Sequence, residues 1–186
     1  MHLKVFPDVY EPGEDSYLML GAVKCERGER VLDMGCGCGI LAVKAALQGA
    51  KVLAVDINRR AAKNALYNAK LNGVKVKTLV SDLFSAINPK AEFDRIFFNP
   101  PYVAEEASDV YSRSWAAGEN METVLRFLED LPDFLSRKGR CYLIVSTAGK
   151  PEKVLKAIER QGFSFRTIAS ERFFFEEIKL VEILNL

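Results

Sequence analysis

The stretch Phe-Asp-Arg-Ile-Phe-Phe-Asn-Pro-Pro-Tyr, residues 93–102, constrains the fold more than any other part of this chain. Its apolar run Ile96–Phe98 predicts a strand that is covered on both faces, as in a parallel sheet flanked by helices. Pro100 and Pro101 end the strand, because proline has no N–H group to donate to a sheet. Asn99 precedes a proline and is therefore held in the extended region of backbone conformation. The strand should end in a stiff tip that is rich in hydrogen-bond acceptors.

This tip has groups that suit a planar amino or amide group. The Asn99 side-chain oxygen and the Pro100 backbone carbonyl are two acceptors, and an NH2 group has two hydrogens to donate to them. Tyr102 adds an aromatic face on which a planar group or a cation can rest. Asn-Pro-Pro is equally typical of a loop that merely ends a strand. The rest of the chain must therefore decide between these two interpretations.

A second candidate site begins at Arg30–Asp33, a short predicted strand that runs into a glycine-rich loop and a helix from Ile40 to about Gln48. Strand, glycine loop and helix together start a nucleotide-binding unit, because glycines let a ligand approach the backbone and expose N–H groups. The loop also fits a dinucleotide fingerprint that ends at Ala42. A carboxylate at Asp33 would repel phosphate, however, and it favours the ammonium group of S-adenosylmethionine. The loop glycines are Gly35, Gly37 and Gly39.

Two further acids follow predicted strands. Asp56 ends the strand Lys51–Asp56, about twenty residues beyond the loop, where a carboxylate can accept both hydroxyl groups of an adenosine ribose. Asp82 and Leu83 follow the alternating segment Val74–Val80, whose lysines suit the edge of a sheet. Asp82 should therefore lie beside the same crevice, within reach of an adenine amino group. Each acid could instead be an ordinary helix cap or turn residue.

The N-terminal segment Val9–Ser16 is acidic and rich in turn-forming residues. Asp15 or Ser16 is predicted to cap the helix that follows. Tyr10 and Glu11 could instead face a ligand as part of a lid, but the spacing favours the plain cap.

The second half of the chain predicts the rest of an α/β sheet. A polar loop over Val103–Trp115 is interpreted as solvated, and the helix after it is expected to end at Arg137–Gly139. After a buried strand and one more helix come two strands with no helix between them, which implies an antiparallel pair. Phe173–Phe175, between these two strands, should pack within the hairpin. The three strands are Cys141–Val145, Phe165 to about Ser170 and Ile178–Leu184, and the helix runs from Pro151 to Gln161.

All of these elements fit one domain over residues 1–186. We expect an α/β fold: a seven-stranded, mostly parallel Rossmann-like sheet that has a C-terminal antiparallel hairpin and helices on both faces. Asp33, Asp56, Asp82 and the tip would then all lie at the carboxyl ends of strands, which is where open α/β sheets bind ligands.

Composition excludes several classes of function. The net charge is +1 with both signs scattered along the chain, which argues against direct nucleic-acid binding by a broad basic surface. The sequence has no apolar run that could span a membrane and no recognisable signal peptide, so a cytoplasmic location is expected. The single histidine, His2, and the lack of a C-x-x-C pair give no candidate for a histidine base or a structural metal site.

In combination, the three acids, the loop glycines and Asn99–Tyr102 resemble a class I S-adenosylmethionine-dependent methyltransferase that acts on nitrogen. Two more segments, Tyr10–Ser16 and Trp115–Asn120, are similar to the short archaeal and eukaryotic branch of the HemK family. The resemblance implies methylation of the side-chain amide nitrogen of the glutamine in the Gly-Gly-Gln motif of translation release factors. It also implies a small zinc-binding activator subunit that pairs with the sheet edge at Val74–Val80.

The resemblance assigns roles to individual residues. It implies catalytic roles for Asn99, Pro100 and Tyr102, whose acceptors would orient the amide nitrogen for direct attack on a sulfonium methyl group without a general base. Cys36 and Cys38 stand where the family often has serine. The implied cofactor-binding residues are Ser16, Asp33, Gly35, Gly37, Gly39, Asp56, Asp82, Leu83 and Asn99.

Three alternatives remain open on the sequence. An adenine N6-methyltransferase acting on RNA or DNA would use the same tip to hold an adenine NH2 group, with Tyr102 stacked on the base. A non-enzymatic scaffold would keep the fold and dock a partner through its edge strand. A protein lysine methyltransferase would act on basic proteins, which the acidic loop would tolerate.

Overall fold

The computed structural model describes residues 1–101 and 121–186. The predicted site residue Tyr102, the loop Val103–Trp115 and the segment Trp115–Asn120 lie outside the described residues. The described strands are β1 (Arg30–Met34), β2 (Lys51–Asp56), β3 (Val76–Val80), β4 (Phe93–Phe98), β5 (Leu135–Ser146), β6 (Phe163–Arg172) and β7 (Glu177–Asn185). The described helices are α1 (Glu14–Ala22), α2 (Ile40–Leu47), α3 (Arg59–Leu71), α4 (Glu122–Phe134) and α5 (Pro151–Arg160). None of these helices is long and apolar enough to cross a membrane.

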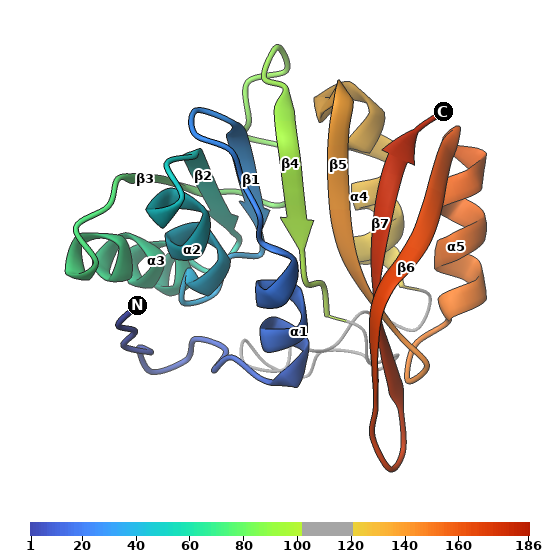
Figure 1. The fold of residues 1–186 in the computed structure, drawn as a ribbon, viewed down its shortest axis with the longest axis horizontal. Coiled ribbons are helices and arrows are strands. Elements are labelled where there is room, and N and C mark those ends of the chain that lie inside the picture. The colour runs from blue at the N-terminus through green and yellow to red at the C-terminus, as the bar shows by residue number, and fades with distance from the viewer. Residues whose placement is uncertain (102–120) are drawn as a thin grey trace.

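The strands form one sheet in the order β3-β2-β1-β4-β5-β7-β6 (Figure 1). Strands β1 to β5 run parallel to one another, and β7 is antiparallel to both β5 and β6. The predicted seven-stranded, mostly parallel sheet with a C-terminal antiparallel hairpin is therefore confirmed. The chain runs outward from β1 to β3 and then returns to β4 beside β1. This reversal marks the carboxyl ends of β1 and β4 as the place where such sheets bind ligands.

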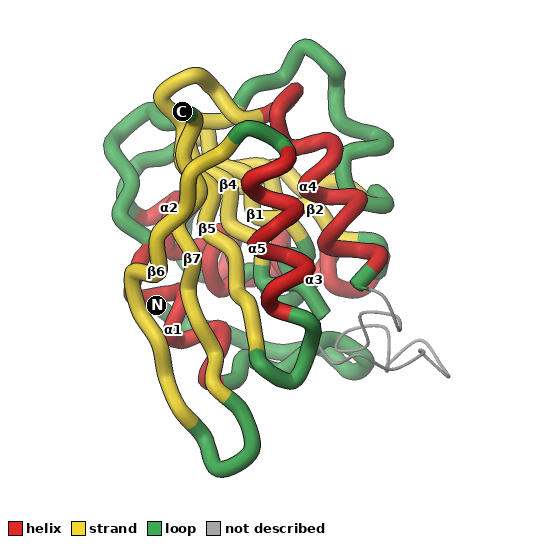
Figure 2. Tube along the Cα trace, turned by 90° about the vertical axis from the view of Figure 1, so that its right-hand side faces the viewer, coloured by secondary structure: helices red, strands yellow, loops and turns green. Residues whose placement is uncertain are grey.

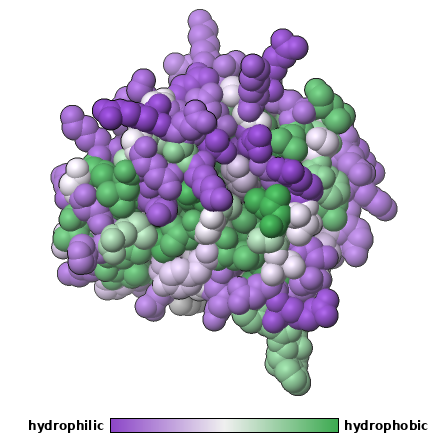
Figure 3. Space-filling model, viewed as in Figure 1, coloured by the Kyte–Doolittle hydropathy of each residue, from purple (hydrophilic) through white to green (hydrophobic). Residues whose placement is uncertain are grey.

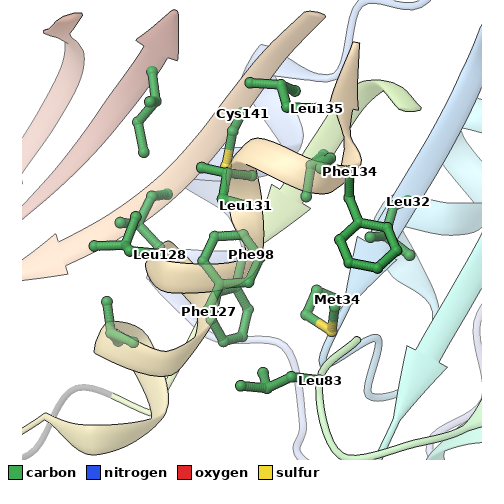
Figure 4. Close-up of a cluster of buried hydrophobic side chains, with 14 of the residues drawn as sticks. Leu32, Met34, Leu83, Phe98, Phe127, Leu128, Leu131, Phe134, Leu135 and Cys141 are labelled. Atoms are coloured by element: carbon green, nitrogen blue, oxygen red, sulfur yellow. The ribbon is translucent and has the colours of Figure 1, made fainter. Parts of the chain in front are cut away.

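Helices cover both faces of the sheet, as predicted (Figure 2). α1, α2 and α3 pack on one face, and α4 and α5 pack on the other. Neighbouring residues of β4 belong to different layers, because side chains alternate along a strand. Phe97 stacks on Tyr142 with ring centroids 5.1 Å apart, whereas Phe98 meets Phe127 of α4 at 4.4 Å (Figure 4). Phe97 is 0% and Phe98 2% exposed, so β4 is buried on both faces as its apolar run predicted.

The start of α1 differs from the prediction. The helix begins at Glu14 with Gly13 as its N-cap, and no side chain caps it. The predicted caps Asp15 and Ser16 lie inside the first turn, where both are buried. The prediction that Asp15 or Ser16 caps this helix is therefore wrong.

The predicted helix end at Arg137–Gly139 is wrong, because α4 stops at Phe134 and β5 begins at the next residue. Pro132 has no N–H group and weakens the last turn of the helix. Gly139 serves strand packing rather than a helix cap: an added Cβ would lie 2.9 Å from the Phe93 carbonyl oxygen at the start of β4. The segment Arg137–Gly139 has the residue pattern of a helix end, but it lies within β5, where Gly139 allows a close contact with β4.

The edge strand β3 is confirmed at one end of the sheet, but it begins at Val76 rather than Val74. The Val74 N–H donates to the Ala69 carbonyl at 3.0 Å, and the Gly73 N–H donates to the Lys70 carbonyl at 3.0 Å. These two bonds close α3 in a Schellman motif, for which Gly73 takes a left-handed conformation with φ of 68°. Val74 therefore belongs to the end of the helix and not to the strand.

Candidate active site

Four predicted site residues end four neighbouring strands. In sheet order, Asp82 follows β3, Asp56 ends β2, Asp33 lies near the end of β1 and Asn99 follows β4. Adjacent strands are about 4.8 Å apart, so these residues span about 14 Å along the carboxyl edge of the sheet. The fold thus brings them together in one row that is long enough for an elongated small molecule.

The glycine loop between β1 and α2 needs glycine at its three predicted positions. Gly35, Gly37 and Gly39 have φ values of 63°, 52° and 83°, which glycine adopts without strain. At Gly39 an added Cβ would also lie 2.7 Å from the Cα of Ala65, so the loop packs directly on α3. At Gly35 it would lie 3.6 Å from the Phe98 ring. The loop therefore contacts α3 on one side and the end of β4 on the other.

Asp33 is a buried carboxylate to which no described lysine or arginine is paired. Its Oδ2 accepts one hydrogen bond of 3.0 Å from the Ala42 N–H. Burial raises the pKa of Asp33 to about 7; the Ala42 hydrogen bond opposes this shift and the charge of Asp56 adds to it. A cationic ligand would offset the unfavourable burial, so Asp33 suits an amine.

Asp56 stabilises the glycine loop through a hydrogen bond to its backbone. Its Oδ2 accepts a hydrogen bond from the Gly37 N–H at 2.9 Å, and its Oδ1 accepts one from the Asn58 N–H at 2.8 Å. Asp56 is not the cap of α3, because Asn58 takes that role and accepts from the Arg60 N–H. Burial raises the pKa of Asp56 above its ordinary value, and these two hydrogen bonds oppose the shift. A carboxylate has about four acceptor sites, so about two remain for ligand hydroxyl groups.

Asp82 lies at the rim of the row, with 47% of its side chain exposed. It forms an ion pair of 2.8 Å with Arg126 on α4, which no sequence pattern had predicted. Leu83 is buried and has a positive φ of 49°, an uncommon conformation for leucine. Ser81 holds this turn, because its hydroxyl donates to the Leu83 carbonyl at 2.9 Å and accepts from the Ala86 N–H at 3.0 Å.

Asn99 has an acceptor atom that the described chain does not satisfy. Its Oδ1 is buried and is the one such side-chain atom, among the described residues, without a hydrogen-bond partner there. A buried acceptor without a partner costs about 1–3 kcal/mol, and native proteins keep few of them. The next residue, Pro100, is buried as well. The strand end therefore offers an acceptor to a donor group from elsewhere.

The segment before α1 lies over the glycine loop. The Tyr10 carbonyl oxygen is 4.0 Å from the position that a Cβ would occupy at Gly37. The Tyr10 hydroxyl is 3.2 Å from both carboxylate oxygens of Asp15, and the Ser16 N–H donates to Asp15 Oδ1 at 2.6 Å. Glu11 is exposed. The plain-cap interpretation of this segment is wrong, because Gly13 is the N-cap of α1 and the carboxylate of Asp15 instead accepts hydrogen bonds within the segment.

A ladder of three asparagines, Asn64, Asn68 and Asn72, anchors the N-terminal segment to α3. The three are spaced four residues apart, so their side chains lie on one face of the helix. They form hydrogen bonds of 2.6–2.9 Å with backbone groups at positions 2, 4 and 6. Four helical residues rise about 6 Å and two extended residues rise about 6.7 Å, so the two repeats match. The helix therefore binds the segment much as a neighbouring strand would.

This asparagine ladder also reaches the site. Asn68 Nδ2 donates to the Cys38 carbonyl of the glycine loop at 2.8 Å. Farther along the segment, Asn58 Nδ2 donates to the Asp8 carbonyl at 2.9 Å, and Arg60 pairs with the Asp8 carboxylate. The signal that could have revealed the ladder is asparagine at every fourth position of a helix, because asparagine is a poor helix former.

The cysteines of the glycine loop are neutral thiols. Burial raises the pKa of Cys38 to about 11 and that of Cys36 well above its ordinary value. Neither is therefore a thiolate nucleophile near neutral pH. Within residues 1–101 and 121–186, three or more His, Cys, Asp or Glu side chains nowhere gather in a way that could hold a metal ion.

Known proteins share both the sequence and the fold. The family model described as methyltransferase small domain matches residues 10–172. A Methanocaldococcus jannaschii protein with the provisional name protein N5-glutamine methyltransferase is 35% identical and aligns over 99% of this chain and 95% of its own. Human methyltransferase HEMK2 is 34% identical over 90% of this chain and 85% of its own. The E. cuniculi Mtq2–Trm112 complex, described as responsible for methylation of the eRF1 translation termination factor, matches with a TM-score of 0.77 and 26% identity, over 96% of this chain and 99% of that chain.

Proposed function

The chain belongs to the methyltransferase small domain family, and we propose that it methylates the side-chain amide nitrogen of a glutamine in a translation release factor. Its relatives have names that refer to glutamine N5 and to eRF1, which supports this substrate. The proposed acceptor is the glutamine of the Gly-Gly-Gln motif.

One observation carries the proposal: the buried Oδ1 of Asn99, which has no partner among the described residues. A glutamine side chain ends in a primary amide with two N–H donors. Asn99 Oδ1 and the Pro100 carbonyl are acceptors on consecutive residues, so the two N–H groups can be satisfied together. An acceptor that has no partner among the described residues suits a substrate that brings the donor.

The row of site residues fits S-adenosylmethionine, which supplies an electrophilic methyl group on its sulfonium when bound. Following their order along the sheet edge, we assign Asp33 to an ammonium group, Asp56 to ribose hydroxyls and Asp82 to an adenine amino group. The absence of a described cationic partner at Asp33 favours this assignment over a phosphate-containing dinucleotide. The remaining proposed cofactor residues are Ser16, Gly35, Gly37, Gly39, Leu83 and Asn99.

Asn99 and Pro100 would act on the acceptor nitrogen through orientation and charge. An amide nitrogen is a weak nucleophile, because its lone pair is delocalised into the carbonyl. Hydrogen bonds from its two hydrogens to the Asn99 and Pro100 oxygens hold the nitrogen in one direction and stabilise the positive charge that develops on it. Tyr102 is proposed to cover the planar amide. The nitrogen loses its proton after it has gained the methyl group, so no base is needed beforehand.

We also propose that a small activator subunit pairs with β3. This strand forms one edge of the sheet, and Val80 at its end is 47% exposed. The free edge of such a strand can continue a sheet across an interface. The similarity to Mtq2, whose solved structure is a complex with Trm112, supports a two-chain assembly.

The test is methyl transfer from labelled S-adenosylmethionine by the chain with its activator. Four acceptors are compared: a release factor, the same factor with its Gly-Gly-Gln glutamine changed to alanine, bulk RNA, and a basic protein. Label on the unaltered release factor alone supports the proposal. Label on RNA would favour the adenine methyltransferase, and label on the basic protein would favour the lysine methyltransferase. Failure to bind S-adenosylmethionine would favour the non-enzymatic scaffold.

A further inference from the structure

The hairpin between β6 and β7 has two aromatic side chains exposed at its tip. The expectation that Phe173–Phe175 would all pack within the hairpin is wrong for two of them. Phe173 is partly buried against the core, whereas Phe174 is 94% and Phe175 92% exposed. Their rings contact each other edge to face, with centroids 4.8 Å apart. The tip stands out as an apolar projection next to polar side chains at its base (Figure 3).

This tip projects past the edge of the sheet that holds the candidate active site. Phe98 pairs with Leu143 of β5, and Leu143 pairs with Val181 of β7. Glu177, the first residue of β7, is four residues before Val181 in an antiparallel strand, which places it about 13 Å beyond the level of Phe98, and Phe175 lies in the turn beyond it. β7 is two strands away from β4, a lateral distance of about 10 Å. The hairpin therefore projects beyond the carboxyl edge of the sheet, two strands away from β4 (Figure 1).

The hairpin is fastened where it leaves the sheet. The Thr147 N–H donates to the Glu177 carbonyl at 3.0 Å, and the Glu177 N–H donates to Thr147 Oγ1 at 2.8 Å. The Ser146 hydroxyl donates to the Glu176 carboxylate at 2.6 Å, and the Phe173 N–H donates to the Glu176 carbonyl at 2.8 Å. Ser146 is the last residue of β5 and Thr147 follows it, so both contacts lie at the carboxyl end of that strand. The base of the hairpin is therefore held in place relative to the site.

The geometry points to a protein substrate as the partner of this tip. A glutamine side chain that reaches Asn99 leaves its own backbone, and the domain around it, just outside the carboxyl edge. Two exposed phenylalanines can each bury roughly 150–250 Å² against such a domain, and aromatic side chains dominate interface energetics. β3, the edge proposed for the activator, is at the opposite end of the sheet, so the hairpin remains free in that assembly. Residues 171–179 include three acidic side chains and two basic ones, which suits neither an anionic membrane nor nucleic acid.

We propose that Phe174 and Phe175 dock an apolar patch on the surface of the folded release factor, outside the loop that carries the acceptor glutamine. The proposal rests on the proposed function and adds to it a second contact, distant from the methyl transfer. In this proposal the hairpin tip recognises the folded release factor, whereas Asn99 recognises the glutamine side chain. A change at the tip should therefore weaken binding of the folded release factor and leave binding of the glutamine side chain unaffected.

The experiment compares two substrates for the variant Phe174→Ser/Phe175→Ser, with the activator present. With full-length eRF1, KM should rise by about tenfold or more while kcat stays close to wild type. With a short peptide that carries the acceptor glutamine, both KM and kcat should be unchanged. A direct binding titration of eRF1 should show the same loss of affinity without turnover. Leu47→Ser, which changes an equally apolar side chain that is 48% exposed on α2, is the control and should leave all values unchanged.

Three results would overturn the docking proposal. The first is an unchanged KM and binding affinity for eRF1, and the second is an equal loss with eRF1 and with the peptide. The third is a variant whose only change is weaker self-association on gel filtration, which would identify a second copy of the chain as the occupant. If the wild-type enzyme binds S-adenosylmethionine but methylates neither substrate, the proposed function itself fails, and the docking proposal fails with it.

Discussion

Asp33 lies opposite Phe97 in the register of β1 and β4, so Asn99 is only two residues farther along the neighbouring strand. Strand spacing and rise place the Cα atoms of Asp33 and Asn99 about 8 Å apart. One residue is a buried carboxylate without a described cationic partner, and the other has a buried acceptor without a described donor. The fold thus keeps two unfavourable groups next to each other, and each suits a different ligand.

Asp33→Asn should stabilise the protein without cofactor at neutral pH while abolishing cofactor binding. The folded pKa of Asp33 is raised to about 7, whereas the pKa of an unfolded aspartate is about 3.9. Between these values the folded state binds more protons than the unfolded state, so the wild-type residue lowers the free energy of unfolding as pH rises. The variant should gain up to about 4 kcal/mol above pH 7 and little below about pH 4. Urea unfolding across this range measures the gain, and a gain independent of pH would contradict the assignment.

Asn68→Ala should destabilise the protein and weaken cofactor binding, although Asn68 is not one of the proposed cofactor contacts. The side chain is fully buried and bonds both backbone groups of Lys4 and the Cys38 carbonyl. Its removal leaves buried polar groups unpaired, at a cost of about 2–4 kcal/mol. The cofactor Kd should rise severalfold, because the N-terminal segment is no longer held over the glycine loop.

Asn72→Ala is the matched control for Asn68→Ala. Its bonds to His2 are exposed, so its effect on stability should stay below about 1 kcal/mol. Isothermal titration at a temperature where both variants are folded measures the two Kd values. Equal Kd values for wild type and Asn68→Ala would show that the ladder contributes to stability alone.

Glu182→Gln should lower stability at neutral pH and have little effect at low pH. Burial alone would raise the pKa of Glu182, but hydrogen bonds from Arg140 and Arg166, at 2.7 and 2.6 Å, hold it below its ordinary value. A depressed folded pKa contributes stability above the unfolded value of about 4.3, and this contribution is lost as pH falls through the folded pKa. Both arginines are partly exposed, so a loss of about 1–2 kcal/mol is expected near pH 7. Denaturant unfolding near pH 7 and pH 3 checks this, and an equal loss at both would contradict it.

The residues that belong to one strand or one loop were predictable from the sequence. The β4 run, the three acids and the loop glycines each follow from a local pattern, and parallel strands bring their carboxyl ends to one edge. Features that depend on distant partners were not predictable. The asparagine ladder needs an extended segment about sixty residues earlier, and the ion pair between Asp82 and Arg126 needs α4 to cross the edge of the sheet.

Two patterns were misread because tertiary contacts overrode the local signal. Arg-Lys-Gly at 137–139 has the composition of a helix end. In the structure, however, Gly139 lies in β5, and its lack of a side chain allows β5 to approach the Phe93 carbonyl. Three consecutive phenylalanines indicate burial by their hydrophobicity, but a hairpin tip has no core on either side of it. Only Phe173 is near enough to the sheet to pack against it.

The most direct test of the proposed chemistry is Asn99→Ala, measured for turnover, cofactor affinity and stability together. We predict that kcat on the release factor falls about 100-fold to 1,000-fold, as for loss of one group that stabilises a transition state. The cofactor Kd should stay within about twofold of wild type, and the free energy of unfolding should be unchanged or higher, because the lost acceptor had no described partner. Near-wild-type kcat, or a parallel loss of cofactor affinity and turnover, would contradict the role of Asn99 in holding the acceptor amide.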